Sequence, residues 1–129
     1  MRTLLITPLL ALAFAAPSSA ATAPFQVTLT AATHTPKVNA HWRYMVEVAT
    51  AAGKPIPAQI TVQTVDPFGG VHPVEFDCCT KNIVAYPFMG LFCEQIEFPA
   101  EARGFKLTFR VVVKARGKTA VRTYWVKPT

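Results

Sequence analysis

The three cysteines are the residues of this sequence whose chemistry is easiest to recognise. Cys78 and Cys79 are neighbours, and Cys93 lies further along the chain. In an oxidising compartment an odd number of cysteines predicts one structural disulfide and one remaining thiol. Strand alternation turns Cys78 inward and turns Cys79 and Cys93 outward. We therefore predict a Cys79–Cys93 disulfide and a buried free thiol at Cys78, and we rank a vicinal Cys78–Cys79 bridge below this pairing.

A thiolate metal site is the alternative use of the three cysteines. Thiolates joined by a histidine would select Cu(I) or zinc, which prefer soft ligands. The chain has no Cys-x-x-Cys motif, however, and His34, His41 and His72 follow no ligand spacing. We expect no metal and no cofactor. An exported protein that handles thiols or metals remains the alternative function.

Side chains that could catalyse a reaction do not occur in a usable pattern. The sequence has no Gly-x-Ser-x-Gly elbow, no His-Glu-x-x-His motif and no glycine-rich phosphate loop. Its serines, Ser18 and Ser19, both lie near the N-terminus. Glu94 and Glu97 are three positions apart, so on a strand they would face opposite sides. We expect no catalytic residue and no enzymatic activity.

Charge is divided unevenly along the chain. Six acids and a single base, Lys81, occur from Asp66 to Glu101, whereas eight bases and no acid occur from Arg103 onward. This predicts an electrically two-sided domain. The basic part could bind an anionic polymer, a lipid surface or an acidic protein, and no nucleic acid is expected as the partner of an exported chain. The alternative explanation is that these charges discourage edge-to-edge aggregation of strands. The candidate anion-binding residues are Lys106, Arg110, Lys114, Lys118 and Arg122.

The arrangement of these bases depends on the turn that joins the last two strands. A two-residue loop at Arg116-Gly117 would set Arg122 opposite Val111 and place that charge on the core face. A three-residue loop over residues 115–117 sets Val121 opposite Val111 and gives Gly117 a left-handed conformation. We predict the three-residue loop, because a slip of one residue reverses every side chain.

The predicted register assigns a face to several side chains. Arg110 lies directly opposite Arg122 on the outward side. Trp125 faces inward and Tyr124 faces outward. Like charges placed opposite each other destabilise a sheet modestly, and no acid follows Glu101 to relieve the pair Arg110–Arg122.

Short runs of period-two alternation, separated by Pro, Gly and Asn, are typical of an all-β protein. Trp42 and Tyr44 belong to one such run, so we expect them in the core rather than on a surface that stacks sugars or bases. About seven strands, each apolar on one side, predict an antiparallel two-sheet β-sandwich. The predicted strands span residues 25–30, 42–48, 59–64, 74–78, 92–98, 106–114 and 119–126, and residues 80–90 are assigned no element.

Two segments resemble those of bacterial immunoglobulin-like or fibronectin-type-III-like domains. The first is the turn over residues 53–58, Gly-Lys-Pro-Ile-Pro-Ala, which leads into Ile-Thr-Val. The second is the valine-rich closing hairpin over residues 107–126. Unlike antibody domains, the chain has no cysteine pair spaced around a core tryptophan. The resemblance implies an adhesion, spacer or recognition module, a class that shares no active site.

The N-terminal segment has the pattern of a secretory signal peptide. Arg2 precedes an apolar run over residues 4–16, and the small residues Ser18 and Ala20 fit a cleavage site after Ala20. The run is shorter than the roughly 20 apolar residues that span a bilayer. We therefore expect residues 1–20 to be removed, with no transmembrane anchor left. Residues 21–129 then form one immunoglobulin-like β-sandwich domain, secreted or periplasmic, acting as a non-catalytic binding or structural module.

The exported protein should begin at Ala21, because signal peptidase cleaves after the small residue at the end of the pattern. N-terminal sequencing of protein from the exported fraction checks this. Recovery of Met1 in that fraction would show instead that the apolar run is retained.

Overall fold

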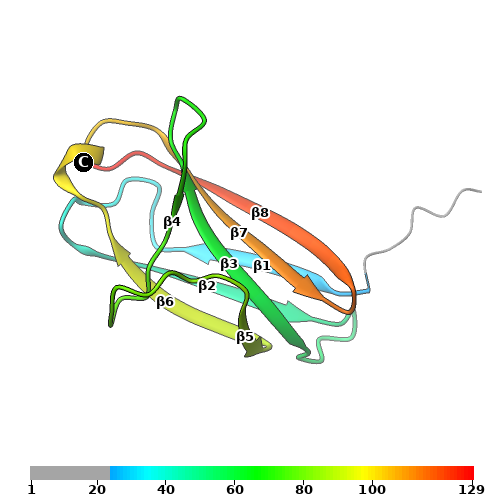
Figure 1. Ribbon diagram of the computed structural model, residues 1–129. Coiled ribbons are helices and arrows are strands. Elements are labelled where there is room, and N and C mark those ends of the chain that lie inside the picture. Colours follow the sequence, from blue (N-terminus) through cyan, green and yellow to red (C-terminus); the bar gives the residue numbers. More distant parts are fainter. Residues whose placement is uncertain (1–23) are drawn as a thin grey trace, which may run out of the picture.

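The computed structural model describes residues 24–129, so the predicted signal peptide lies outside the described residues. Within this range two antiparallel sheets pack face to face (Figure 1). The all-β two-sheet prediction is confirmed, with eight strands rather than about seven. A single turn of 3-10 helix, η1 (Ala100–Ala102), interrupts them. No helix in the described part of the chain has the length and apolar character needed to cross a membrane.

The two sheets differ in size. The smaller sheet has the strand order β1-β2-β6, formed by β1 (Gln26–Ala31), β2 (His41–Ala49) and β6 (Leu91–Glu97). The larger has the order β4-β3-β7-β8, and a further short strand, β5, also pairs with β3. Its strands are β3 (Pro57–Val65), β4 (Val71–Pro73), β5 (Tyr86–Met89), β7 (Leu107–Ala115) and β8 (Lys118–Val126).

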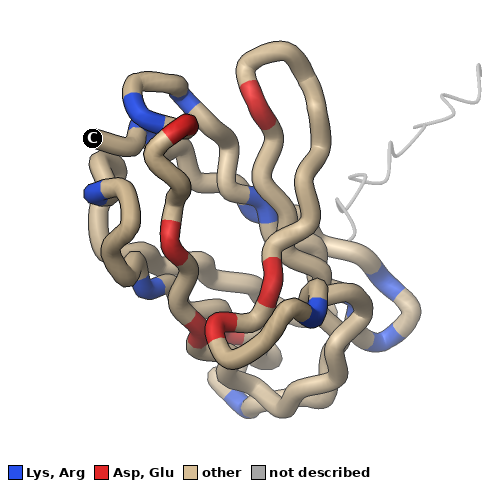
Figure 2. Tube along the Cα trace, turned by 60° about the vertical axis from the view of Figure 1, so that its left-hand side comes forward, with Lys and Arg blue, Asp and Glu red and all other residues tan. Residues whose placement is uncertain are grey.

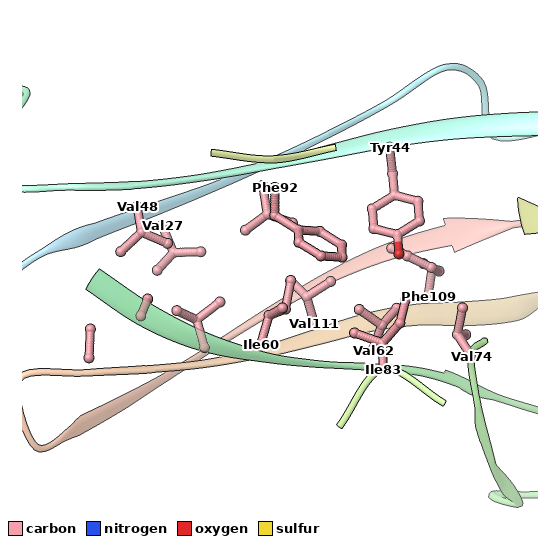
Figure 3. Close-up of a cluster of buried hydrophobic side chains, with 14 of the residues drawn as sticks. Val27, Tyr44, Val48, Ile60, Val62, Val74, Ile83, Phe92, Phe109 and Val111 are labelled. Carbon is pink, nitrogen blue, oxygen red and sulfur yellow. The ribbon is translucent and has the colours of Figure 1, made fainter. Parts of the chain in front are cut away.

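Alternating apolar residues of both sheets form one core. Figure 3 shows Tyr44 and Phe92 of the smaller sheet pointing toward Ile60, Val62 and Phe109 of the larger. Trp42 is 2% exposed, and its indole Nε1 donates a hydrogen bond to the carbonyl of Thr33 at 2.7 Å. The prediction that Trp42 and Tyr44 are core residues is therefore confirmed.

The predicted strand over residues 74–78 is wrong. The strand in this region is β4, over residues 71–73, which pairs with the end of β3, and the chain then turns back on itself. The amide of Phe76 donates to the carbonyl of Lys81 at 2.9 Å, and the amide of Cys79 donates to the carbonyl of Phe76 at 3.3 Å. These local bonds make a tight loop, and β5 then forms within residues 80–90, which the sequence pattern left unassigned.

The predicted register of the last hairpin is also wrong. Ala115 pairs with Lys118, so the loop has two residues, and Val111 lies opposite Arg122. Arg116 and Gly117 both have positive φ, 48° and 71°. Two successive left-handed residues make a type I′ turn, whose twist matches that of the flanking strands. This turn geometry therefore determines the pairing.

The expectation that Arg122 could not lie on the core face is wrong because β8 is the edge strand of its sheet. Arg122 lies on the inward side, but at the seam between the sheets, where its Nε donates to the carbonyl of Val27 in β1 at 3.0 Å. The aromatic faces are reversed as well: Trp125 is 45% exposed, and Tyr124 packs against the core. An inward position on an edge strand can thus hold a charge.

The segment between β1 and β2 covers part of the β8 edge. The amide of Lys127 donates to the carbonyl of His34 at 2.7 Å, and the amide of Thr129 donates to Pro36 at 2.8 Å. Val38 donates back to the carbonyl of Thr129 at 3.0 Å. Both segments advance in the same direction, so this is a short parallel pairing at the end of an otherwise antiparallel structure.

The hydroxyl of Tyr44 is buried without a hydrogen-bond partner. Burial, with the nearby Glu94 carboxylate, raises the pKa of Tyr44 far above its ordinary range. We expect Tyr44→Phe to raise the free energy of unfolding by about 1 kcal/mol, because a buried polar group without a partner destabilises the fold. Urea denaturation measures this. Tyr86→Phe, at a ring that is 39% exposed, is the matched control and should change little; a stability loss at Tyr44→Phe would contradict the expectation.

Candidate functional site

The five candidate anion-binding residues do not form one surface. Arg110 donates from Nε and Nη2 to the Oε1 atom of Gln63, at 3.0 and 2.7 Å, on the outer face of the larger sheet. It lies opposite Thr123, whereas Arg122 points to the other side of the sheet. The pairing of Arg110 with Arg122 that we predicted is therefore wrong, because the hairpin register differs by one residue.

The remaining candidates lie apart from these two arginines. The Lys106 ammonium is 5.3 Å from the ring centre of Trp125. His34 stacks on that ring at 3.9 Å, so little of Trp125 is free for stacking. Lys114 and Lys118 flank the β7–β8 turn, at the far end of the hairpin. The sequence-predicted surface is thus divided among four places.

The cysteines are paired differently from our prediction. The structure joins Cys78 to Cys79, and Cys93 is the free, exposed thiol. Cys79 lies in the tight loop after Phe76 and not on a strand, so strand alternation does not determine its direction. Cys93 does face outward on β6, as expected, opposite Met45 of β2. Within residues 24–129 no three His, Cys, Asp or Glu side chains are grouped closely enough to hold a metal ion.

A pocket of about 910 Å³ opens at one end of the sandwich. Its walls come from both sheets: β2 and β6 contribute on one side, and the ends of β3, β4 and β7 on the other. Its apolar lining includes the buried side chains of Val74 and Phe98. A volume of this size suits an organic ligand or a protruding segment of a partner. This pocket is the candidate functional site.

The pocket carries an unusual concentration of negative charge. Five of the seven acidic residues of the chain line it, and no lysine or arginine within residues 24–129 does. Figure 2 shows the Asp and Glu positions gathered on neighbouring segments of the trace, with most Lys and Arg positions on other segments. The five carboxylates belong to Asp66, Glu75, Asp77, Glu97 and Glu101.

One rim of the pocket is the loop between β3 and β4. The Asp66 carboxylate organises it: Oδ1 accepts hydrogen bonds from the amides of Phe68 and Gly70, at 2.8 and 2.9 Å. Its Oδ2 lies 2.8 Å from Nε2 of His72. The His72 hydrogen bond, followed by that of Gly70, lowers the pKa of Asp66 below its usual range. The loop thereby holds Phe68, which is 89% exposed, beside the pocket.

The opposite rim joins the loop after β4 to the edge of β6. Nε2 of Gln95 donates to Oδ2 of Asp77 at 2.8 Å. Nδ1 of His41 lies 3.6 Å from carboxylate oxygens of both Asp77 and Glu97. Among the described residues, Glu75 and Glu101 have no side-chain hydrogen bond or ion pair; both are exposed. Their charges are therefore free to meet a ligand.

The sequence does not predict this pocket directly, although it contains one signal of the site, an acid-rich stretch. The acid-rich stretch from Asp66 to Glu101 was read only as one side of a charge asymmetry. Its members come from separate loops and strand ends, and only the fold brings them around one opening. His41 and Leu107, from distant parts of the chain, complete the lining.

Comparisons with known proteins give limited information. A scan against models of protein families and a search of curated proteins both find no match. Among solved structures, the chain is similar to a DUF4466 family protein from Parabacteroides merdae ATCC 43184, with 16% sequence identity and a TM-score of 0.46. The similarity covers 79% of this chain and 44% of that protein, so the chain spans less than half of its length.

The Asp66 contacts predict a pH dependence of stability. The folded state lowers the pKa of Asp66. The ionised Asp66 side chain therefore contributes fully to the free energy of unfolding above the ordinary aspartate pKa of about 3.9. This contribution is lost as the pH falls through the lowered pKa. Urea denaturation between pH 6 and pH 2 should therefore show a stability gap between the wild type and Asp66→Asn that narrows in acid. A gap that stays constant down to pH 2 would contradict this role.

Proposed function

We propose that this chain is an exported, non-catalytic, immunoglobulin-like recognition module that binds a cationic segment in the pocket at the end of its sandwich. The observation that carries the proposal is the pocket's composition: an apolar lining with five carboxylates and, among the described residues, no lysine or arginine. A ligand that fits has one or more guanidinium or ammonium groups next to apolar groups.

The strand order supports the immunoglobulin-like class. Lettered as in immunoglobulin domains, β1, β2 and β6 correspond to strands A, B and E, while β3, β7 and β8 correspond to C, F and G. Loops cluster at the two ends of such sandwiches, and loops at one end commonly bind partners. The pocket lies among loops at one such end.

The energetics indicate how a cation would be held. An exposed ion pair contributes only about 0–1 kcal/mol, so no single carboxylate suffices. Several carboxylates around one opening sum their fields and attract a cation before contact. Burial of its apolar part against Phe98 and Phe68 adds about 25 cal/mol for each Å² removed from water. Charge would then select the ligand, and apolar burial would retain it.

A short peptide of alternating arginine and phenylalanine is the direct probe. Fluorescence anisotropy should show binding that weakens when salt rises to 0.5 M, since screening shortens the reach of the carboxylates. The same peptide with citrulline in place of arginine keeps the size and hydrogen bonds but loses the charge. Equal binding of the citrulline peptide would contradict the proposal.

Variants of the free carboxylates locate the binding. Glu75→Gln and Glu101→Gln should each raise the dissociation constant of the arginine peptide about 2- to 5-fold, which is the effect of losing one partly screened ion pair. Glu47→Gln is the matched control, because Glu47 is exposed on β2 and outside the pocket. An equal loss in Glu47→Gln would place the binding elsewhere.

A further inference from the structure

The tip of the β7–β8 hairpin is an exposed cationic feature of the fold. Lys114, Arg116 and Lys118 are exposed and lie within five consecutive residues around the type I′ turn. In the described part of the chain, none of them has a carboxylate within ion-pair distance. Val121, on β8 near the turn, is 46% exposed and adds an apolar surface beside the charges.

The tip lies at the end of the sandwich opposite the pocket. β7 begins at Leu107, which lines the pocket, and ends at Ala115 beside the turn. Eight strand steps at about 3.3 Å each separate the two by about 26 Å. Figure 1 shows the β7–β8 turn and the β3–β4 loop at opposite ends of the molecule. The tip of one molecule therefore cannot reach its own pocket.

The tip and the pocket are complementary in charge. A two-residue turn joins two neighbouring strands about 4.8 Å apart, so the three bases are presented close together. The tip would bring three cations to a pocket whose described lining has five carboxylates and no lysine or arginine. Among the described residues, the three bases of the tip and the carboxylates of Glu75 and Glu101 have no ion-pair partner, so joining the two ends relieves repulsion in both.

We propose that the cationic segment bound by the pocket is the β7–β8 hairpin tip of a second copy of this chain. This inference rests on the proposed function and names its partner. The two surfaces are different, so the contact is heterologous, and a pair of joined molecules keeps one free pocket on one copy and one free tip on the other. Repetition of the contact gives a linear head-to-tail assembly.

Sedimentation velocity of the exported protein tests the assembly. In low salt the average mass should rise with concentration, and at 0.5 M salt the apparent dissociation constant should increase at least about 10-fold. The double variant Arg116→Gln/Lys118→Gln should lose association at low salt. The control Lys37→Gln/Lys127→Gln removes the same charge from exposed positions away from the tip and should still associate.

A mixing experiment gives the sharpest outcome. The tip variant Arg116→Gln/Lys118→Gln keeps its pocket, and the pocket variant Glu75→Gln/Glu101→Gln keeps its tip. Alone, each should be monomeric; mixed in equal amounts, they should form a dimer that grows no further. Circular dichroism checks that both variants are folded.

The possible results separate the two proposals. Binding of the arginine peptide by a protein that stays monomeric at every concentration would overturn the self-assembly and leave the proposed function standing. Self-association that the tip substitutions do not reduce, or mixed variants that stay monomeric, would also overturn it. Failure to bind either the peptide or a second copy would overturn both proposals.

Discussion

The Trp42 side chain is the contact on which both the core and the pocket depend. Its ring meets Phe98 at 5.5 Å and Phe109 at 5.0 Å, each edge to face, so one residue of the smaller sheet touches the larger sheet and the chain that leaves β6. Its indole nitrogen also fixes the segment after β1 through the carbonyl of Thr33. Aromatic contacts of this kind favour one geometry as well as burial. Phe98, held in this way, forms part of the pocket wall.

The carboxylates around the pocket conflict with the stability of the fold. Like charges gathered around one opening repel each other, and His41 and His72 lie against only some of them. A sequence selected for stability alone would place lysine or arginine among these acids. None of the lysines and arginines in the part of the chain that the structure describes lines the pocket. This separation of charge is the physical reason to regard the pocket as a site.

Much of the fold could be predicted from the sequence, because burial on one face of each strand produces the alternation directly. Val111 and Val113 lie inward as predicted, and Trp42 and Tyr44 are in the core. The hairpin register could not be obtained in the same way, since the argument treated β8 as a covered strand and ignored the turn at Arg116. The pocket could not be predicted either: its carboxylates are adjacent only after β3, β6 and the intervening loops are in place.

The parallel pairing of residues 34–38 with residues 127–129 determines how the domain would respond to mechanical load. β1 starts at the end of the sandwich near the β7–β8 turn, and Thr129 lies at the pocket end. A force applied between these points acts along the strands. It shears the hydrogen bonds of β1 and of the terminal parallel pair together and does not open them one after another. Many bonds must therefore yield at once, which makes this geometry resistant to extension.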